Sequence, residues 1–427
     1  MTARVTVPHA TSPDRPSSTA ARRDEVCLAH VTTVPKSLGF LTGQVGFMKA
    51  RGFAVTAISS PDDDLASFAE REAVPVYAVP MARRITPGRD LIALWQLARV
   101  FRRVRPDIVH AATPKGGLLG ILAASLTRVP VRVYHIRGLP MMTATGVRRM
   151  LLRWSERVAC AGASQVLCVS GSVRDVAVRE HLCKPEKIKV LASGSGNGVD
   201  STVRFDPDRV ADRRTIVRQA LAIDPDAVVL GFVGRVVRDK GIEDLLEAWR
   251  TLRDACPSLH LVIAGELEDE DRVPDDVRQA LSTDHRVHLL GRWRDTPALY
   301  AALDVVVLPT YREGFPNVPL EASAMRLPVV ATRIPGCIDA VVDGVTGTLV
   351  PVRDATALAA ATRRYVDDPA LRAAHGNAGR ERVVRDFAQE VIWEALHAEY
   401  VRLLDAAGVS ERMHREPSAR NRVATAR

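Results

Sequence analysis

The feature that most constrains the fold is a repeated alternation of short β-branched runs with amphipathic helical stretches. Such alternation is typical of parallel sheets whose faces are covered by helices. Helical periodicity is clearest in Asp90–Arg103, Gly116–Thr127, Gly146–Ala161 and Gly241–Ala255. The runs predicted to be strands are Val26–Val31, Ala54–Ser59, Val76–Val79, Asp107–Ala111, Val131–Ile136, Val166–Ser170 and Ile188–Leu191, then Val228–Gly234, Leu259–Gly265, Val287–Leu290, Val305–Leu308, Val329–Thr332 and Thr348–Val350.

The alternation is interrupted once, between residues 194 and 218, where the chain is rich in Gly, Ser, Asn and Asp and then strongly charged. We therefore expect an α/β protein with two doubly wound, Rossmann-like domains that face each other across a cleft. The N-terminal domain is predicted at 25–200 and the C-terminal domain at 201–386. A final helix, predicted at 387–406, is followed by no strand and is free to pack back across the first domain.

Composition favours a soluble globular protein with disordered ends. Of the 427 residues, 47% are hydrophobic and 26% are charged, and no apolar run is long enough to span a membrane. Residues 1–24 are rich in Pro, Ser, Thr and Ala and contain no apolar core of a signal peptide, so we expect a disordered arm. Residues 407–427 are polar and basic, and we expect a disordered tail.

The cysteines and the net charge narrow the functional classes. The six cysteines show no metal-ligand spacing, which indicates a reduced, cytoplasmic protein without a structural metal. The formal charge is +9, but no nucleic-acid recognition motif accompanies it. Anionic substrates or an anionic membrane surface are the preferred partners, and the alternative is that the excess charge lies in tails and solvated faces.

The loop after the run Val305–Leu308 carries two carboxylates, Glu313 and Glu321, on either side of a Gly- and Pro-rich turn. Pro319 suits the first position of a helix, which would place Glu321 in the first helical turn. The alternative is that Glu321 only complements the helix dipole. Glu313 has no capping role, and a carboxylate there can accept hydrogen bonds from vicinal hydroxyls of a sugar or ribose.

A second loop, after Val228–Val233, gathers cations between Gly234 and Gly241. Arg235 offers a planar fork and Lys240 a point charge, and both suit an oxygen-rich diphosphate. Gly241 before a helix would let backbone amides approach that anion. The alternative is an ordinary basic turn.

In combination, Arg235, Lys240 and the spacing Glu313-x7-Glu321 in a second doubly wound domain resemble the family 4 retaining glycosyltransferases of GT-B fold. Further similar segments are Val169–Ser170, Asn197–Asp200 and Ile334–Gly347. The resemblance implies transfer of a hexosyl group from a nucleotide diphosphate sugar to a hydroxyl acceptor, with retention at the anomeric carbon.

The resemblance also implies roles for individual residues. Arg235 and Lys240 would bind the donor diphosphate, Glu321 the ribose hydroxyls, and Glu313 with the neighbouring amides the donor sugar. The implied donor-binding set is Gly234, Arg235, Lys240, Glu313, Gly314, Phe315, Pro316, Asn317, Val318 and Glu321. No cofactor or metal is expected, because no Asp-x-Asp set lies beside these loops, and Asp62–Asp64 is predicted to be a solvated loop.

The first domain is expected to hold the acceptor. Ser37 and Gly39 lie in the loop after the first strand, where much of the family carries a Gly-Gly pair. His135 ends the run Val131–Ile136 and resembles the family histidine near the donor sugar, so it joins Glu313, Arg235 and Lys240 as a predicted catalytic residue. His110 also ends a strand, and we predict a structural role for it.

The N-terminal half resembles capsule and O-antigen enzymes, which act on polyprenyl-diphosphate-linked sugars. The basic stretch 146–161 could lie on an anionic inner membrane, or it could be a core helix with a solvated basic face. This predicts a cytoplasmic or peripheral membrane protein. Alternative functions are glycosylation of a soluble metabolite, a GT-B-type epimerase or phosphorylase, and a non-catalytic nucleotide-sugar or nucleic-acid binder.

Overall fold

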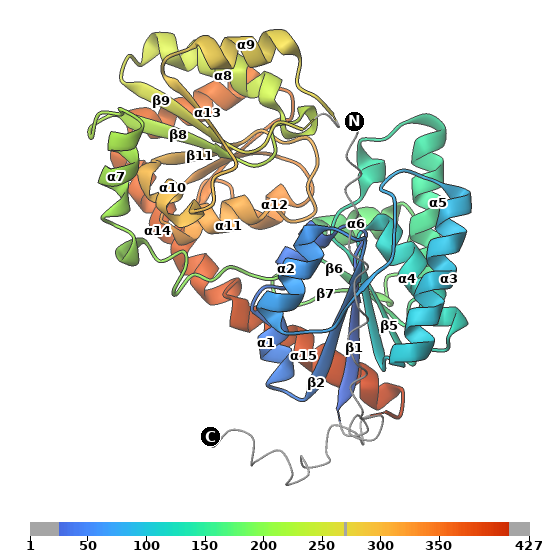
Figure 1. Cartoon of the computed structure of the whole chain (residues 1–427). Coiled ribbons are helices and arrows are strands. Elements are labelled where there is room, and N and C mark those ends of the chain that lie inside the picture. Colours follow the sequence, from blue (N-terminus) through green and yellow to red (C-terminus); the bar gives the residue numbers. More distant parts are fainter. Residues whose placement is uncertain (1–24, 269–270, 410–427) are drawn as a thin grey trace, which may run out of the picture.

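The computed structural model describes residues 25–268 and 271–409 and contains two α/β domains (Figure 1). The arm predicted for 1–24 and most of the tail predicted for 407–427 lie outside the described residues. The first domain has a parallel sheet in the order β3-β2-β1-β4-β5-β6-β7. Its strands are β1 (Val26–Val31), β2 (Phe53–Ser59), β3 (Val76–Ala78), β4 (Ile108–Ala112), β5 (Val131–Ile136), β6 (Gln165–Cys168) and β7 (Ile188–Val190).

The second domain has a parallel sheet in the order β10-β9-β8-β11-β12-β13. Its strands are β8 (Val228–Val233), β9 (Leu259–Ala264), β10 (Val287–Gly291), β11 (Val305–Leu308), β12 (Val329–Thr332) and β13 (Gly347–Val350). Every run predicted as a strand is a strand, and the predicted fold class of two doubly wound sheets is confirmed. In each sheet the strand order reverses once, between β1 and β4 and between β8 and β11, which is where ligands bind in such folds.

Helices bury both faces of each sheet, as parallel strands require. In the first domain α3 (Pro87–Val104), α4 (Pro114–Leu126), α5 (Gly146–Gly162) and α6 (Gly171–Arg179) pack on one face. The 3-10 helix η1 (Pro35–Leu41) with α1 (Gln44–Lys49), α2 (Asp63–Glu72) and α15 (Gln389–Ala406) covers the other. In the second domain α8 (Ile242–Ala255), α9 (Asp275–Thr283) and α13 (Ala355–Asp367) face α10 (Thr296–Ala302), α11 (Asn317–Ala324), α12 (Cys337–Ala340) and α14 (Pro369–Asp386) across the sheet.

One local prediction was wrong, and one segment contains a helix that was not predicted. The acidic run Asp62–Asp64 is not a loop: Asp62 is the N-cap of α2, and Asp63 and Asp64 lie in its first turn, where the helix dipole favours negative charge. The charged stretch between the domains also contains a helix, α7 (Arg213–Ala220). Its Arg214 and Arg218 both pair with Asp304 at the start of β11, at 2.7 Å each, so packing against the second sheet orders this segment.

The chain passes between the domains twice, and the two crossings are joined to each other. Val199 pairs with Ala388 as an isolated parallel bridge, and the Val199 amide donates to the Phe387 carbonyl at 2.9 Å. After the second crossing, α15 runs back along the first domain, as Figure 1 shows. None of the helices in the described ranges is long and apolar enough to cross a membrane.

A buried acid inside the first domain predicts a measurable pH dependence of stability. Glu156 on α5 accepts a hydrogen bond from the Tyr134 hydroxyl at 2.6 Å, and burial raises its pKa to about 7 from 4.5. The folded protein therefore keeps a proton that the unfolded chain releases, so stability falls as pH rises from about 4.5 to about 7. We expect Glu156→Gln to remove this loss, which amounts to roughly 3 kcal/mol in the free energy of unfolding.

Chemical denaturation of both proteins at a series of pH values measures the effect. Glu70→Gln, at an exposed position of α2, is the matched control and should leave the pH profile of the wild type unchanged. Parallel profiles for the wild type and Glu156→Gln would contradict the assignment.

Candidate active site at the domain junction

The loops that follow the strands of both sheets meet at the junction between the domains. The Ser170 hydroxyl, after β6, donates to the carbonyl oxygen of Gly314, after β11, at 2.8 Å. The Gly336 amide donates to the Ser172 hydroxyl at 2.7 Å, and the Ser172 amide donates to Asp339 Oδ1 at 3.1 Å. The carboxyl ends of the two sheets are thus joined through a few direct hydrogen bonds.

Two of the predicted site residues, Lys240 and Glu313, form an ion pair with each other. Lys240 ends the short 3-10 helix η4 (Arg238–Lys240) after β8, and Glu313 lies in the loop after β11. Both side chains are largely buried, with 17% and 13% exposed. The cation predicted for the diphosphate and the carboxylate predicted for the sugar therefore neutralise each other here, and an anionic ligand must compete for Lys240.

Arg235, the other predicted diphosphate ligand, is also held by an acid. Its Nη1 lies 2.8 Å from Glu268 Oε2, and half of its side chain is exposed. Glu268 belongs to the loop after β9, and sequence reasoning did not single it out. Because β8 and β9 are adjacent strands, their end loops meet, and only the strand order reveals this pairing.

Gly241, which is predicted to let backbone amides approach an anion, also has a packing role. It adopts the left-handed conformation at φ 70°, and its amide donates to the Arg238 carbonyl at 2.9 Å. A Cβ at this position would lie 1.9 Å from the carbonyl oxygen of Pro309. Glycine is thus required so that the loops after β8 and β11 can pack together, and its amide is already used.

Glu321 lies deeper in its helix than the sequence indicated. Because α11 begins at Asn317, Pro319 is its third residue and Glu321 its fifth, so Glu321 is not in the first turn. The Tyr300 hydroxyl, from α10, donates to Glu321 Oε2 at 2.9 Å, and burial raises the pKa of Glu321. A role limited to the helix dipole therefore does not explain this carboxylate, which is held by a tyrosine that no local motif marks.

The remaining residues predicted to bind the donor include two whose side chains pack against the core of the second domain. Phe315 packs on Phe387, with ring centroids 5.4 Å apart, and Val318 contacts the core of the second domain. Pro316 is the N-cap residue before Asn317. The side chains of Phe315 and Val318 are partly buried against this core. Gly234, which follows β8, has φ 148°.

His135 is buried at the end of β5 and belongs to a chain of hydrogen-bonded groups. His135 Nδ1 lies 3.0 Å from His110 Nε2, and His110 Nδ1 lies 2.5 Å from the Tyr400 hydroxyl. Burial and the charge of Arg137 lower the pKa of His135 well below 6.5, so the ring is neutral. His110 is buried between His135 and Tyr400. Tyr400, on α15, was not predicted because it comes from the far end of the chain.

The predicted acceptor-side residues lie on η1, which also reaches the second domain. Ser37 is half-buried and Gly39 is exposed, with its carbonyl accepting a hydrogen bond from the Thr42 hydroxyl at 2.9 Å. Lys36 Nζ lies 3.6 Å from Glu266 Oε2, after β9. The loop that contains Ser37 and Gly39 is therefore placed opposite the second sheet.

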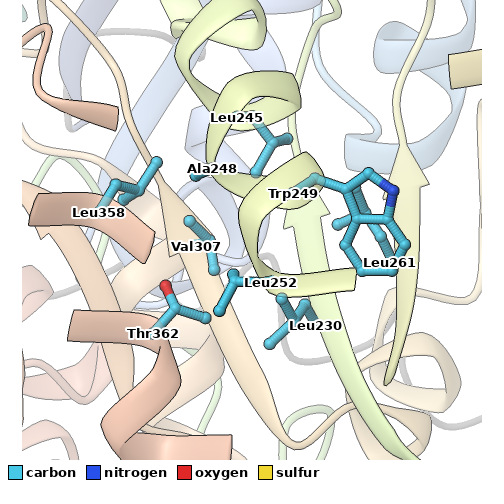
Figure 2. Close-up of a pocket in the computed structure, with 9 residues that line it drawn as sticks. All are labelled: Leu230, Leu245, Ala248, Trp249, Leu252, Leu261, Val307, Leu358 and Thr362. Atoms are coloured by element: carbon cyan, nitrogen blue, oxygen red, sulfur yellow. The ribbon is translucent and has the colours of Figure 1, made fainter. Parts of the chain in front are cut away.

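A small cavity inside the second domain is not this site. It lies within the second domain between α8, α13 and the sheet, and its lining is apolar apart from Thr362 (Figure 2). The space open to a water-sized sphere is about 10 Å³, too small for a substrate. Within the described part of the chain, no three His, Cys, Asp or Glu side chains are grouped so as to hold a metal ion.

Comparison with known protein families gives two matches that together cover most of the chain. Residues 213–382 match the model of the glycosyl transferases group 1, and residues 42–194 match the glycosyl transferase 4-like domain. The boundary between the two matches falls in the segment that joins the two sheets.

Individual relatives agree with these matches. The chain is 33% identical to the capsular polysaccharide biosynthesis glycosyltransferase CapM of Staphylococcus aureus, over 87% of this chain and 96% of that protein. It is 26% identical to the UDP-Gal:alpha-D-GlcNAc-diphosphoundecaprenol alpha-1,3-galactosyltransferase of Escherichia coli, over 85% and 93%. Among solved structures, Anabaena Alr3699/HepE in complex with UDP-glucose has a similar fold, with a TM-score of 0.74 at 20% identity, covering 88% of this chain and all of that one.

The Tyr300–Glu321 hydrogen bond allows the predicted role of Glu321 in nucleotide binding to be tested. Tyr300→Phe removes the hydroxyl that holds Glu321, which raises the pKa of that carboxylate further and weakens it as an acceptor for ribose hydroxyls. We expect nucleotide affinity, measured by titration calorimetry, to fall about three- to tenfold.

Tyr365→Phe is the matched control, because the Tyr365 hydroxyl bonds Thr348 and His375 elsewhere in the second domain. It should change melting temperature without changing nucleotide affinity. Equal affinities for Tyr300→Phe and the wild type would remove Glu321 from the site.

Proposed function

Because the chain belongs to the family 4 glycosyltransferases of GT-B fold, we propose that it moves a hexosyl group from a nucleotide diphosphate sugar to a hydroxyl acceptor with retention at the anomeric carbon. The observation that carries the proposal is the Lys240–Glu313 pair at the strand-order reversal of the second sheet. It gathers a phosphate-binding cation and a hydroxyl-binding carboxylate at one point.

The proposed reaction breaks the bond between the anomeric carbon and the diphosphate oxygen and forms one to the acceptor oxygen on the same face. The acceptor's hydroxyl proton passes to the departing diphosphate. We assign no carboxylate as a covalent nucleophile, so attack from the front face is the preferred route. Rate enhancement comes from positioning and from fixed positive charge where negative charge develops.

Binding of the donor diphosphate at Lys240 requires the Lys240–Glu313 ion pair to break. A diphosphate that reaches Lys240 displaces the Glu313 carboxylate, and that carboxylate is then free to accept hydrogen bonds from the donor sugar. Arg235, held by the exposed loop after β9, can move from Glu268 to the same diphosphate. No metal or cofactor is part of this proposal, since the two cations supply the charge.

Relatives favour a lipid-linked acceptor. CapM is named for capsular polysaccharide biosynthesis, and the Escherichia coli relative is named for a diphosphoundecaprenol-linked acceptor. We therefore place the reaction in cell-surface polysaccharide assembly, at the cytoplasmic face of the membrane where such an acceptor is anchored. Glycosylation of a soluble metabolite is the alternative.

A panel of UDP-, GDP- and dTDP-sugars in a thermal-shift assay tests the function. We expect at least one of them to raise the melting temperature, because a donor that binds only the folded protein stabilises it. Lys240→Ala should then lower turnover by about 10²- to 10³-fold with folding intact, since it removes one fixed charge from the leaving group.

Lys187→Ala is the control, because that ammonium bonds the Ala161 carbonyl on the first domain at 2.9 Å. A flat response to every sugar nucleotide would refute the proposal. Conversion of a sugar nucleotide in the absence of acceptor would favour an epimerase instead.

The first domain also carries a surface that suits a membrane, which we call the α3/α5 face. Its exposed apolar side chains lie on two helices that cover the same side of the sheet and flank α4 (Figure 1). They are Leu91, Ile92 and Trp95 on α3 and Val147, Met150, Leu151 and Trp154 on α5. Met141 and Met142, which precede α5, do not belong to this face, because Met141 is buried and Met142 packs on the core.

Basic side chains lie on the same two helices. Arg148 and Arg157 are exposed on α5, and Arg99 lies over the Trp95 ring at 4.7 Å. Arg149 and Arg153 pair with Glu180, so part of the α5 charge is neutralised. Exposed tryptophans among arginines fit the interface of an anionic bilayer, so this face would bring the acceptor domain to a lipid-linked substrate.

Vesicle flotation tests the α3/α5 face. The double variant Trp95→Ala/Trp154→Ala should bind phosphatidylglycerol vesicles at least about tenfold more weakly than the wild type, since each tryptophan loses its buried apolar area. High salt should weaken wild-type binding. The control Ile216→Ala/Val384→Ala alters exposed apolar residues of the second domain and should bind like the wild type. Equal binding by both double variants would exclude this face.

A further inference from the structure

Arg137 is a cation at the domain junction that the proposed donor site does not use. It follows β5 directly and lies two residues after His135, and its charge lowers the pKa of the His135 ring. Its carbonyl oxygen lies against Gly314, where a Cβ would come within 1.9 Å of it. Arg137 therefore stands beside the loop that carries Glu313, on the side of the first domain.

The guanidinium of Arg137 is held in place by close packing. Its central carbon lies 5.4 Å from the centre of the Phe40 ring, on η1. On another side is Gly196, where a Cβ would come within 2.6 Å of Arg137 Nη1. The group is thus positioned between the predicted acceptor loop and the segment that leads to the second domain.

The charge of this guanidinium has no carboxylate partner among the residues that the structure describes. The ionisable groups that influence it or are influenced by it are His30, His110, His135 and Tyr400. None of them supplies a negative charge. Burial is the main cause that lowers the pKa of all three histidines, that of His30 to about 3, and the charge of Arg137 lowers these pKa values further. Burial likewise raises the pKa of Tyr400.

Arg137 itself stays charged at neutral pH, because burial lowers its pKa only to about 10. By contrast, each of the basic side chains of the opposing donor loops has a carboxylate partner. Lys240 pairs with Glu313, Arg235 with Glu268 and Arg312 with Asp239. A partly buried cation without a counter-charge is costly, and a planar guanidinium binds phosphate oxygens through paired hydrogen bonds.

We propose that Arg137 is a phosphate subsite of the acceptor, so that the substrate accepting the sugar carries a phosphate or diphosphate group near the reacting hydroxyl. This rests on the proposed glycosyl transfer. The acceptor is the preferred source because Arg137 projects from the first domain beside Phe40 on η1. The donor diphosphate has two cations of its own on the second domain.

Binding of inorganic pyrophosphate tests the subsite without turnover. The protein is first saturated with the nucleoside diphosphate of the donor found in the thermal-shift panel, which occupies Arg235 and Lys240. Pyrophosphate is then titrated by calorimetry. We expect Arg137→Gln to weaken pyrophosphate binding about 10- to 100-fold, because charge-assisted hydrogen bonds are lost, and Arg137→Lys to be intermediate.

A second variant keeps Arg137 but fills the space beside its guanidinium. Gly196→Ala places a methyl group against Arg137 Nη1 and should also weaken pyrophosphate binding. Arg132→Gln, at the other end of β5, removes a cation that bonds the Gly162 and Val129 carbonyls and should leave pyrophosphate binding unchanged. In steady-state assays Arg137→Gln should raise the acceptor KM and leave the donor KM unchanged.

Competition against pyrophosphate identifies the source of the phosphate. Displacement by a short-chain prenyl diphosphate supports a lipid-linked acceptor, and displacement by glucose 1-phosphate supports a soluble one. Pyrophosphate binding by Arg137→Gln that equals the wild type would overturn the subsite. So would a loss of nucleoside diphosphate binding in that variant, which would make Arg137 a donor ligand. Absence of transfer with every donor refutes the function alone. If no sugar nucleotide binds, pyrophosphate is titrated into the protein without a nucleotide, and weaker binding by Arg137→Gln is still expected.

Discussion

The close backbone contact at Gly314 is the constraint on which the rest of the site depends. A Cβ there would meet the Arg137 carbonyl oxygen at 1.9 Å, and a Cβ at Gly336 would meet the Gly314 carbonyl oxygen at 2.5 Å. Two main-chain segments can approach so closely only where side chains are absent. Because Ser170 also bonds the Gly314 carbonyl, the loop that carries Glu313 is seated against the carboxyl end of the first sheet.

The charges of the site are distributed unequally between the two domains. On the second domain, Lys240, Arg235 and Arg312 are each held by an acid from a neighbouring loop. On the first domain, Arg137 is surrounded by neutral histidines and an aromatic ring. In the proposed reaction an incoming diphosphate replaces a carboxylate at Lys240, whereas Arg137 has no carboxylate partner among the described residues that an anion would have to replace.

The terminal helix connects the site to the segments where the chain crosses between the domains. The two crossings are joined where Val199 pairs with Ala388, and α15 begins one residue later. Farther along the same helix, Tyr400 bonds His110, which in turn bonds His135. The orientation of His135 therefore depends on a helix that enters the first domain only after the chain has left the second.

The sequence by itself determined the elements whose signal is local. The β-branched runs, alternating with helical stretches, predicted all the strands of both sheets. The loops that contain Lys240 and Glu313 were identifiable because they follow buried strands. The tertiary structure decided the rest. Glu321 is held by Tyr300 from another helix, Arg235 by Glu268 from an adjacent strand end, and His110 by Tyr400, which lies 290 positions away. Partners of this kind carry no fixed spacing in the sequence, because strand order and the return of α15 bring them together only when the chain is folded.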